Sequence, residues 1–162
     1  MADKTYFVGV KESAVAANKR HLTIWNGTAA QELRVLWVQA TGAPTAAVAG
    51  LVVPLYVARI TTQPTGGSTL TPSKAVASSP NVPATVECLT GATGGAAEEA
   101  SPFGVGTVSG EETGSLSESV LYQMMLNGAE PVTLGPGTGL VVKQGSLASA
   151  GAISIVVQVS VR

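Results

Sequence analysis

Near the C-terminus, apolar side chains alternate with smaller or polar ones. In the stretch AISIVVQVSVR, residues 152–162, every second position from Ile153 to Val161 holds Ile or Val. A side-chain period of two is typical of a β-strand that buries one face. The pattern therefore predicts a strand here that lies on a hydrophobic core.

Six other stretches are typical of strands, because they are rich in β-branched or aromatic residues and are bounded by Gly, Pro, Asn or Ser. Two of them, 33–38 and 51–58, are apolar on both faces, which is typical of strands that are central or covered. The others are 6–10, 21–25, 85–89 and 140–144. No long helical patterns alternate with these roughly seven or eight strands, so we expect an all-β fold with at most one short helix.

The segment SESVLYQMMLNG, residues 117–128, is compatible with two structures. Ser117 could cap a helix that stops at Gly128, with Leu121 and Met125 near helical spacing. Alternatively, a strand would point Val120 and Tyr122 to one side. We favour the strand, because an all-β chain has little use for one isolated helix.

Two long stretches, 61–84 and 90–115, are rich in Gly, Pro, Ser and Thr and are expected to be loops. Loops of this length in a compact domain are usually functional arms or partly disordered. We divide the chain into an N-terminal arm, residues 1–19, and a single β domain, residues 20–162, that carries both loops.

Composition then narrows the class of function. The 162 residues are 45% hydrophobic but only 12% charged, about half the usual charged fraction of roughly 25%. Such a chain is expected to cover part of its surface with partners. The net charge of −1 gives no field for nucleic acid, and no apolar run is long enough to span a membrane. The signs are segregated, because residues 75–142 hold seven Glu and no Lys or Arg.

The stretch LGPGTGLVV, residues 134–142, raises the question of a phosphate-binding loop. Its glycines have the spacing G-x-G-x-G, and the residues that follow continue as a strand, so no helix N-terminus is available for a phosphate. The pattern instead predicts a tight turn in which Pro136 sets φ and one glycine takes a positive φ.

Candidate catalytic groups are few. His21 is the only histidine and follows Lys19 and Arg20, which favours a surface or interface position over a general base. Cys88 is the only cysteine and is expected to be a buried apolar residue. We therefore expect no enzyme activity, no metal and no cofactor. The acidic pairs Glu98–Glu99 and Glu111–Glu112 are expected to lie in solvated loops. Residues Thr71 to Lys74 resemble the Ser-x-x-Lys nucleophile motif only weakly. Trp25 and Trp37 are expected in the core.

Several turn-and-strand stretches resemble the jelly-roll head decoration, or cement, proteins of tailed bacteriophages. These stretches are LTIWNGT (22–28), LRVLWV (33–38), LVVPLYVARIT (51–61), TGGSTLTP (65–72), PGTGL (136–140) and the closing strand. The resemblance implies a jelly-roll-like β-sandwich of two antiparallel sheets, self-association and binding to an assembled capsid lattice. It implies no catalytic residues and no cofactor.

On this resemblance we expect a virion protein that is made in the host cytoplasm, binds the outer surface of the phage capsid and stabilises the shell. Its partners would be the major capsid protein lattice and copies of itself, as a trimer rather than a dimer by family analogy. The Glu-rich loop would face outward or pair with a neighbour's basic patch. Charge segregation makes the following basic residues candidate capsid contacts: Lys4, Lys11, Lys19, Arg20 and Lys74.

Three alternatives stay open. The first is a tail, baseplate or fibre-associated β-sandwich that binds a receptor glycan, although exposed aromatic residues are scarce. The second is a small hydrolase that uses His21, and the third is a non-viral β-sandwich with a small-molecule pocket.

Overall fold

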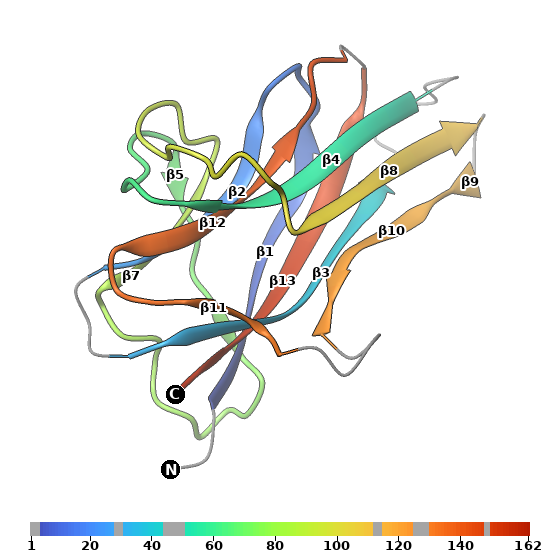
Figure 1. Ribbon diagram of the computed structural model, residues 1–162. Coiled ribbons are helices and arrows are strands. Elements are labelled where there is room, and N and C mark those ends of the chain that lie inside the picture. The colour runs from blue at the N-terminus through green and yellow to red at the C-terminus, as the bar shows by residue number, and fades with distance from the viewer. Residues whose placement is uncertain (1–3, 28–30, 44–50, 112–114, 125–129, 148–149) are drawn as a thin grey trace.

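The chain folds into two antiparallel β-sheets that face each other (Figure 1). This computed structural model describes residues 4–27, 31–43, 51–111, 115–124, 130–147 and 150–162. The prediction of an all-β antiparallel sandwich is confirmed. Its jelly-roll-like connectivity stays a prediction.

The first sheet, called sheet A here, is formed by strands from both ends of the chain. Its strand order is β10-β3-β13-β1-β6, and β11 also pairs with β3. The strands are β1 (Lys4–Ala14), β3 (Leu33–Ala43), β6 (Ser73–Lys74), β10 (Glu118–Gln123), β11 (Val132–Leu134) and β13 (Ala152–Val161).

The second sheet, sheet B, lies across the core from sheet A. Its order is β5-β7-β2-β12-β4-β8-β9. The strands are β2 (Arg20–Asn26), β4 (Leu51–Ile60), β5 (Ser68–Thr69), β7 (Val86–Thr90), β8 (Gly104–Glu111), β9 (Ser115–Leu116) and β12 (Thr138–Gln144).

The inward-facing alternate residues of both sheets make one hydrophobic core. In β13, Ile153, Ile155 and Val157 are fully buried, as the alternation predicts. Leu22 and Ile24 of β2 meet the same core from sheet B. All seven predicted strands are present, and the ambiguous segment 117–128 is a strand as far as Gln123. Residues 125–128 of that segment lie outside the described part of the chain.

Stretches that were expected to be an arm and loops contain strands. Residues 4–14 of the expected arm form β1, which pairs with β13 from Lys4 to Ala14 and contributes Tyr6 to the core. The alternation Tyr6, Val8, Val10 therefore outweighs the nearby charges. Residues 104–111 of the expected loop 90–115 form β8, and 61–84 contains the short strands β5 and β6.

Glycine explains why β8 resembles a loop in the sequence. A Cβ at Gly104 would collide with the carbonyl oxygen of Leu121, and one at Gly106 would collide with the side chain of Ser119. These glycines thus let β8 of sheet B approach β10 of sheet A closely. Hydrogen bonds beside them link the two sheets further, because Ser117 Oγ donates to the Ser109 carbonyl and accepts from the Ser109 N–H, both at 2.6 Å.

The predicted turn before β12 is confirmed. Gly137 has φ of +73°, and the Thr138 N–H donates to the Gly135 carbonyl at 3.1 Å. The Gly137 N–H donates to the Asn26 carbonyl at 2.8 Å, so the turn is bonded to the end of β2.

Candidate functional site

His21 is buried between the sheets, so the prediction of a surface or interface histidine is wrong. It sits at a β-bulge, where β2 inserts one residue opposite Val142 and Lys143 of β12, and its side chain is fully inaccessible. The ring lies 2.8 Å from Ser13 Oγ through Nδ1 and 3.2 Å from Gln144 Oε1 through Nε2. Because an amide oxygen only accepts, Nε2 carries the proton and Nδ1 accepts from the Ser13 hydroxyl.

The Ser13–His21 pair links three strands in a buried position. Burial lowers the pKa of His21 from 6.5 to about 4, against a raising effect of the Gln144 hydrogen bond and with a further lowering by the Lys19 charge. Ser13 is only 8% exposed, so both partners of this hydrogen bond are buried. The neutral ring instead joins β1, β2 and β12 at one end of the sandwich.

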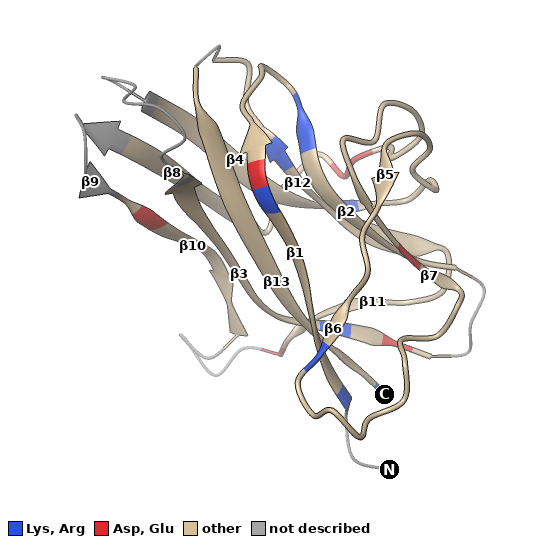
Figure 2. Ribbon diagram, turned by 180° about the vertical axis from the view of Figure 1, so that it is seen from behind, with Lys and Arg blue, Asp and Glu red and all other residues tan. Residues whose placement is uncertain are grey.

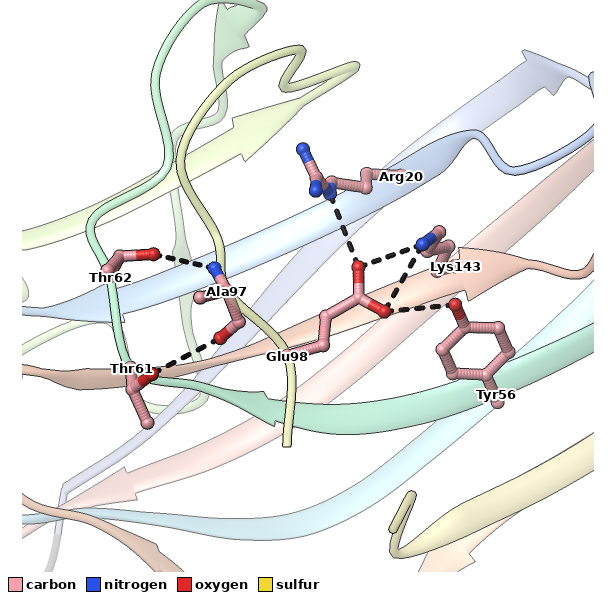
Figure 3. Close-up of polar contacts among 7 residues, drawn as sticks. All are labelled: Arg20, Tyr56, Thr61, Thr62, Ala97, Glu98 and Lys143. Atoms are coloured by element: carbon pink, nitrogen blue, oxygen red, sulfur yellow. Dashed lines mark hydrogen bonds and ion pairs between the residues drawn. The ribbon is translucent and has the colours of Figure 1, made fainter. Parts of the chain in front are cut away.

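A half-buried cluster of polar residues, called the Glu98 cluster, lies on the outer face of sheet B (Figure 3). Glu98 accepts hydrogen bonds from Lys143 Nζ at 3.0 and 3.2 Å and from the Tyr56 hydroxyl at 3.0 Å. Arg20 Nε lies 3.5 Å from the same carboxylate. The side chain of Glu98 is 19% exposed, so its predicted role in a solvated acidic pair is wrong. Glu99 beside it is exposed and contacts Arg59 at 3.4 Å.

The segment that carries Glu98 is bonded to the end of β4. Thr61 N–H donates to the Ala97 carbonyl at 2.9 Å. The Thr61 hydroxyl donates to the same carbonyl at 3.4 Å, and the Ala97 N–H donates to Thr62 Oγ1 at 2.6 Å (Figure 3). Beneath it, Trp25 and Ala96 are buried in a second, smaller apolar cluster. Trp25 is thus in a core, as predicted.

Mutual hydrogen bonds and charge set the ionisation of the cluster. Burial alone would raise the pKa of Glu98, but hydrogen bonds from Lys143 and Tyr56 and the positive charges outweigh it, so the pKa is lowered. Burial also acts against charged Lys143, yet its bonds to Tyr56 and Glu98 raise its pKa. Burial raises the pKa of Tyr56. The three groups therefore stay carboxylate, ammonium and phenol at neutral pH.

A shallow groove of about 520 Å³ runs beside this cluster. It is lined by Tyr56, Ala58, Glu98, Glu99, Ala100, Pro102 and Val105. Its one aromatic ring and two carboxylates suit binding of a small polar ligand, whereas the lining includes no nucleophile paired with a base.

The outer face of sheet A is different, because it carries no charge in its centre. Two adjacent rows of residues cross four strands: Phe7–Gln158–Trp37–Gln123 and Gly9–Val156–Gln39–Val120. A bulge in β3 adds Leu36 to the same side, because Leu36 is skipped in the pairing with β13. We call these nine residues the neutral face. Figure 2 shows the strands β3, β13 and β1 free of charged residues along this stretch.

Exposure supports this assignment of faces. Val120 is 46% and Val156 37% exposed, while their neighbours Leu121, Ile155 and Val157 are buried. Trp37 is half-buried on this face, so its predicted place in the core is wrong. A shallow hollow of about 340 Å³ on this face is lined by Leu36, Trp37, Gln123, Met124 and Gln158.

The five predicted capsid contacts do not form one patch. Lys4 and Lys74 lie at one end of sheet A, close to each other because Lys74 pairs with Tyr6 (Figure 2). Lys11 and Lys19 lie at the other end, where Lys19 Nζ donates to the Ala14 carbonyl. Arg20 belongs to the Glu98 cluster.

Sequence reasoning missed both the Glu98 cluster and the neutral face. The cluster joins β2, β4, β12 and the segment before β8, which are far apart along the chain, so only the segregation of charge hinted at it. The neutral face was detectable, because alternation assigns Val156 and Gln158 to the side opposite the buried Ile and Val residues.

The described residues contain no group of three or more His, Cys, Asp or Glu side chains arranged to hold a metal ion. Burial raises the pKa of Cys88 to about 12, so the thiol stays protonated in the core, as its predicted burial implies. Among the same residues, no helix has the length and apolar character needed to cross a membrane.

Comparison with family models gives no match, and comparisons with curated proteins and with solved structures give no significant match.

Proposed function

We propose that this protein is a structural protein that works by binding other protein surfaces, as a decoration protein on the outside of a tailed-phage capsid. The observation that carries the proposal is the neutral face, which places nine uncharged residues on the outside of four hydrogen-bonded strands. The capsid as the partner is suggested by the resemblance of the strand and turn sequences.

The neutral face has the composition of a protein–protein interface. Such interfaces have a centre depleted of charged residues with enriched aromatic residues, and a polar rim. Here Trp37 lies in the centre and Phe7 at the β1 end of the same row, while Lys11 and Glu118 lie on the row beyond Gly9 and Val120. On a capsid, a modest contact repeated over many copies stabilises the shell through multivalent binding.

The chemistry of the buried groups argues against catalysis. His21 is inaccessible and neutral, and Cys88 is buried as a thiol. Glu98 accepts hydrogen bonds from Lys143 and Tyr56 and is not poised to exchange a proton near neutral pH. A hydrolase built on His21 is therefore not supported.

The test uses heads of the phage whose genome carries this sequence, prepared from a mutant that lacks the protein. Purified protein is mixed with these heads and sedimented, and the heated heads are followed by light scattering. We expect saturable binding with a fixed copy number and a higher disruption temperature. Binding that never saturates, or heads of unchanged stability, would contradict the proposal.

The groove beside Tyr56 supports a second candidate, recognition of a receptor glycan by a tail or fibre component. An aromatic ring next to carboxylates can stack on a sugar and accept bonds from its hydroxyls. Screening the protein on a glycan array separates the two candidates. Specific hits that Tyr56→Ala removes, together with no binding to heads, would favour the glycan.

A further inference from the structure

The two lateral edges of sheet A carry opposite charge. The edge formed by β1 and β6 holds Lys4, Lys11 and Lys74 (Figure 2). At the other edge, Glu118 begins β10, and Glu130 precedes β11. The segregation of sign along the sequence thus becomes a separation across one sheet, with the neutral face between the edges.

The strand register places one of these opposite pairs on a single row. Lys11 follows Val10, which pairs with Ile155, so it lies beside Ser154 of β13. Ser154 pairs with Thr41 of β3, and Thr41 pairs with Glu118 of β10. Lys11 and Glu118 therefore end one row, about three strand spacings or roughly 14 Å apart.

A two-fold axis parallel to β3 and β13 would place each of these rows over the same row of a second copy. Rotation about that axis lays one neutral face on another and exchanges β1 with β10. Lys11 of each copy then meets Glu118 of the other, and this happens twice by symmetry. Within the face, Val120 of one copy lies over Gly9 of the other. The exposed side chain of Val120 therefore faces a residue that has no side chain. Gln158 lies over Trp37.

The outer side of the four strands is large enough for such a dimer when the contact includes the rows beyond the neutral face. Four strands about 4.8 Å apart and about ten residues long cover roughly 650 Å², and the nine residues of the neutral face make up about half of this area. Stable interfaces bury from about 600 Å² per partner upwards. Within one chain, Gln39 Nε2 already donates to Glu118 Oε2 at 3.0 Å. The Gln39 amide oxygen and the amide of Gln158 can bond to groups of an identical face, because an amide both donates and accepts hydrogen bonds.

We propose that a second copy of this chain covers the neutral face, related by a two-fold axis parallel to β3 and β13. The inference rests on the proposed function in taking this face as a protein interface, and it names the occupant and its orientation. It replaces the trimer that family analogy suggested with a dimer. The neutral face then accounts for the self-association that the resemblance implies, and the capsid contact of the proposed function has to lie on a surface outside this face.

Two further charged residues, Glu12 and Arg34, lie near these edges and have the opposite sign to the edge beside them. Glu12 adjoins Lys11, but it is the inserted residue of the bulge, with φ of +50°, whereas Lys11 continues the outward series Phe7, Gly9. Arg34 of β3 lies near the acidic edge. The pairing of Lys11 with Glu118 is consequently the one to test.

The first experiment measures the dimer by sedimentation velocity over a range of concentrations. Val156→Lys places a charge at the centre of the face and should raise the dimer Kd at least tenfold. Val52→Lys is the matched control, because Val52 is 42% exposed on a strand of sheet B, and it should leave the Kd unchanged. If circular dichroism shows Val156→Lys to be misfolded, Gln158→Glu takes its place.

The second experiment tests orientation with Gly9→Val. A Cβ at Gly9 meets only ordinary contacts, to the Ile155 carbonyl and the Val156 side chain, at 3.5 and 3.8 Å, so the monomer should fold normally. In the dimer the new side chain would collide with Val120 of the other copy. The Kd should rise at least tenfold, although the substitution adds apolar surface. An unchanged or lower Kd would overturn the proposed orientation.

The third experiment is a charge exchange. Lys11→Glu and Glu118→Lys should each raise the Kd, by about two- to thirtyfold for an exposed pair that forms twice, and the double variant should restore it. Glu12→Gln should not weaken the dimer. Single variants without effect, or a double variant without rescue, would overturn the pairing.

The oligomeric state of the unaltered protein tests whether the dimer exists at all. A monomer at about 100 μM, or a trimer indifferent to Val156→Lys, would overturn the inference. Either result is distinct from failure of the proposed function, because binding to heads is measured separately. A monomeric protein that still saturates heads would leave the decoration role standing and remove the dimer.

Discussion

His21 shows how one buried side chain links stability to pH. Its pKa falls from 6.5 to about 4 on folding, so between these values the unfolded chain binds a proton that the folded chain excludes. The free energy of unfolding should therefore fall by roughly 3 kcal/mol as the pH drops from 6.5 to 4, and level off below. Urea titrations across this range measure the change. The His21→Asn variant should be less stable overall, and its free energy of unfolding should lack this dependence on pH. The same pH dependence in the variant would contradict the assignment of the effect to His21.

Glu98 acts in a different pH window. Its pKa is lowered on folding, so its stabilising effect is complete above the ordinary value of 4.5 and is lost as the pH falls through the folded pKa. Glu98→Gln should reduce the free energy of unfolding at pH 7 and flatten its decline below pH 4.5. The control is Glu99→Gln, which removes an exposed contact with Arg59 and should have a smaller effect. Equal losses in both variants would argue against the cluster.

Strand β8 depends on two glycines, and this gives a prediction at the scale of an element. Gly104→Ala should lower the free energy of unfolding by about 1–3 kcal/mol, because its Cβ meets the rigid backbone of Leu121. Gly135→Ala is the matched control, since nothing lies within 4 Å of its Cβ, and it should change stability by no more than about 0.5 kcal/mol. Thermal unfolding of both variants checks this. Similar melting temperatures would mean that the sheets do not approach as closely as described.

The elements differ in how far their sequences reveal them. Strands β3, β4 and β13 are long enough for alternation or continuous apolar character to predict them. β8 was missed because the alternate residues that make room for β10 are Gly, the residue type that otherwise marks loops. β5 and β6 are two residues long, too short for any period to appear. Their pairing is decided by neighbours distant in sequence.

The same distinction holds for the candidate sites. Burial of Cys88 and the turn at Gly137 follow from local residue chemistry and were predicted. The burial of His21 was not, because it depends on a bulge in β2 and on Gln144, which lies 123 residues further along the chain. Sequence reasoning detected the separation of charge but not which partners each carboxylate has.

For the whole molecule, the low charge content and the separation of sign have one common explanation if two copies pair through sheet A. The apolar side chains of the neutral face, such as Trp37 and Val156, would provide most of the binding free energy, because burial of apolar surface contributes about 25 cal/mol per Å². The charged edges would fix the orientation, since exposed ion pairs contribute only about 0.2–1 kcal/mol each.

The two contributions respond differently to salt. In about 1 M NaCl the Debye length falls to about 3 Å, so the pairing of Lys11 with Glu118 is screened, whereas apolar burial persists. We expect sedimentation to show the dimer at both low and high salt, with Kd rising by less than about thirtyfold. Lys11→Glu should lose its effect in high salt, while Val156→Lys should stay dissociated. Complete dissociation of the unaltered protein by salt would mean that the charged edges, and not the neutral face, hold the copies together.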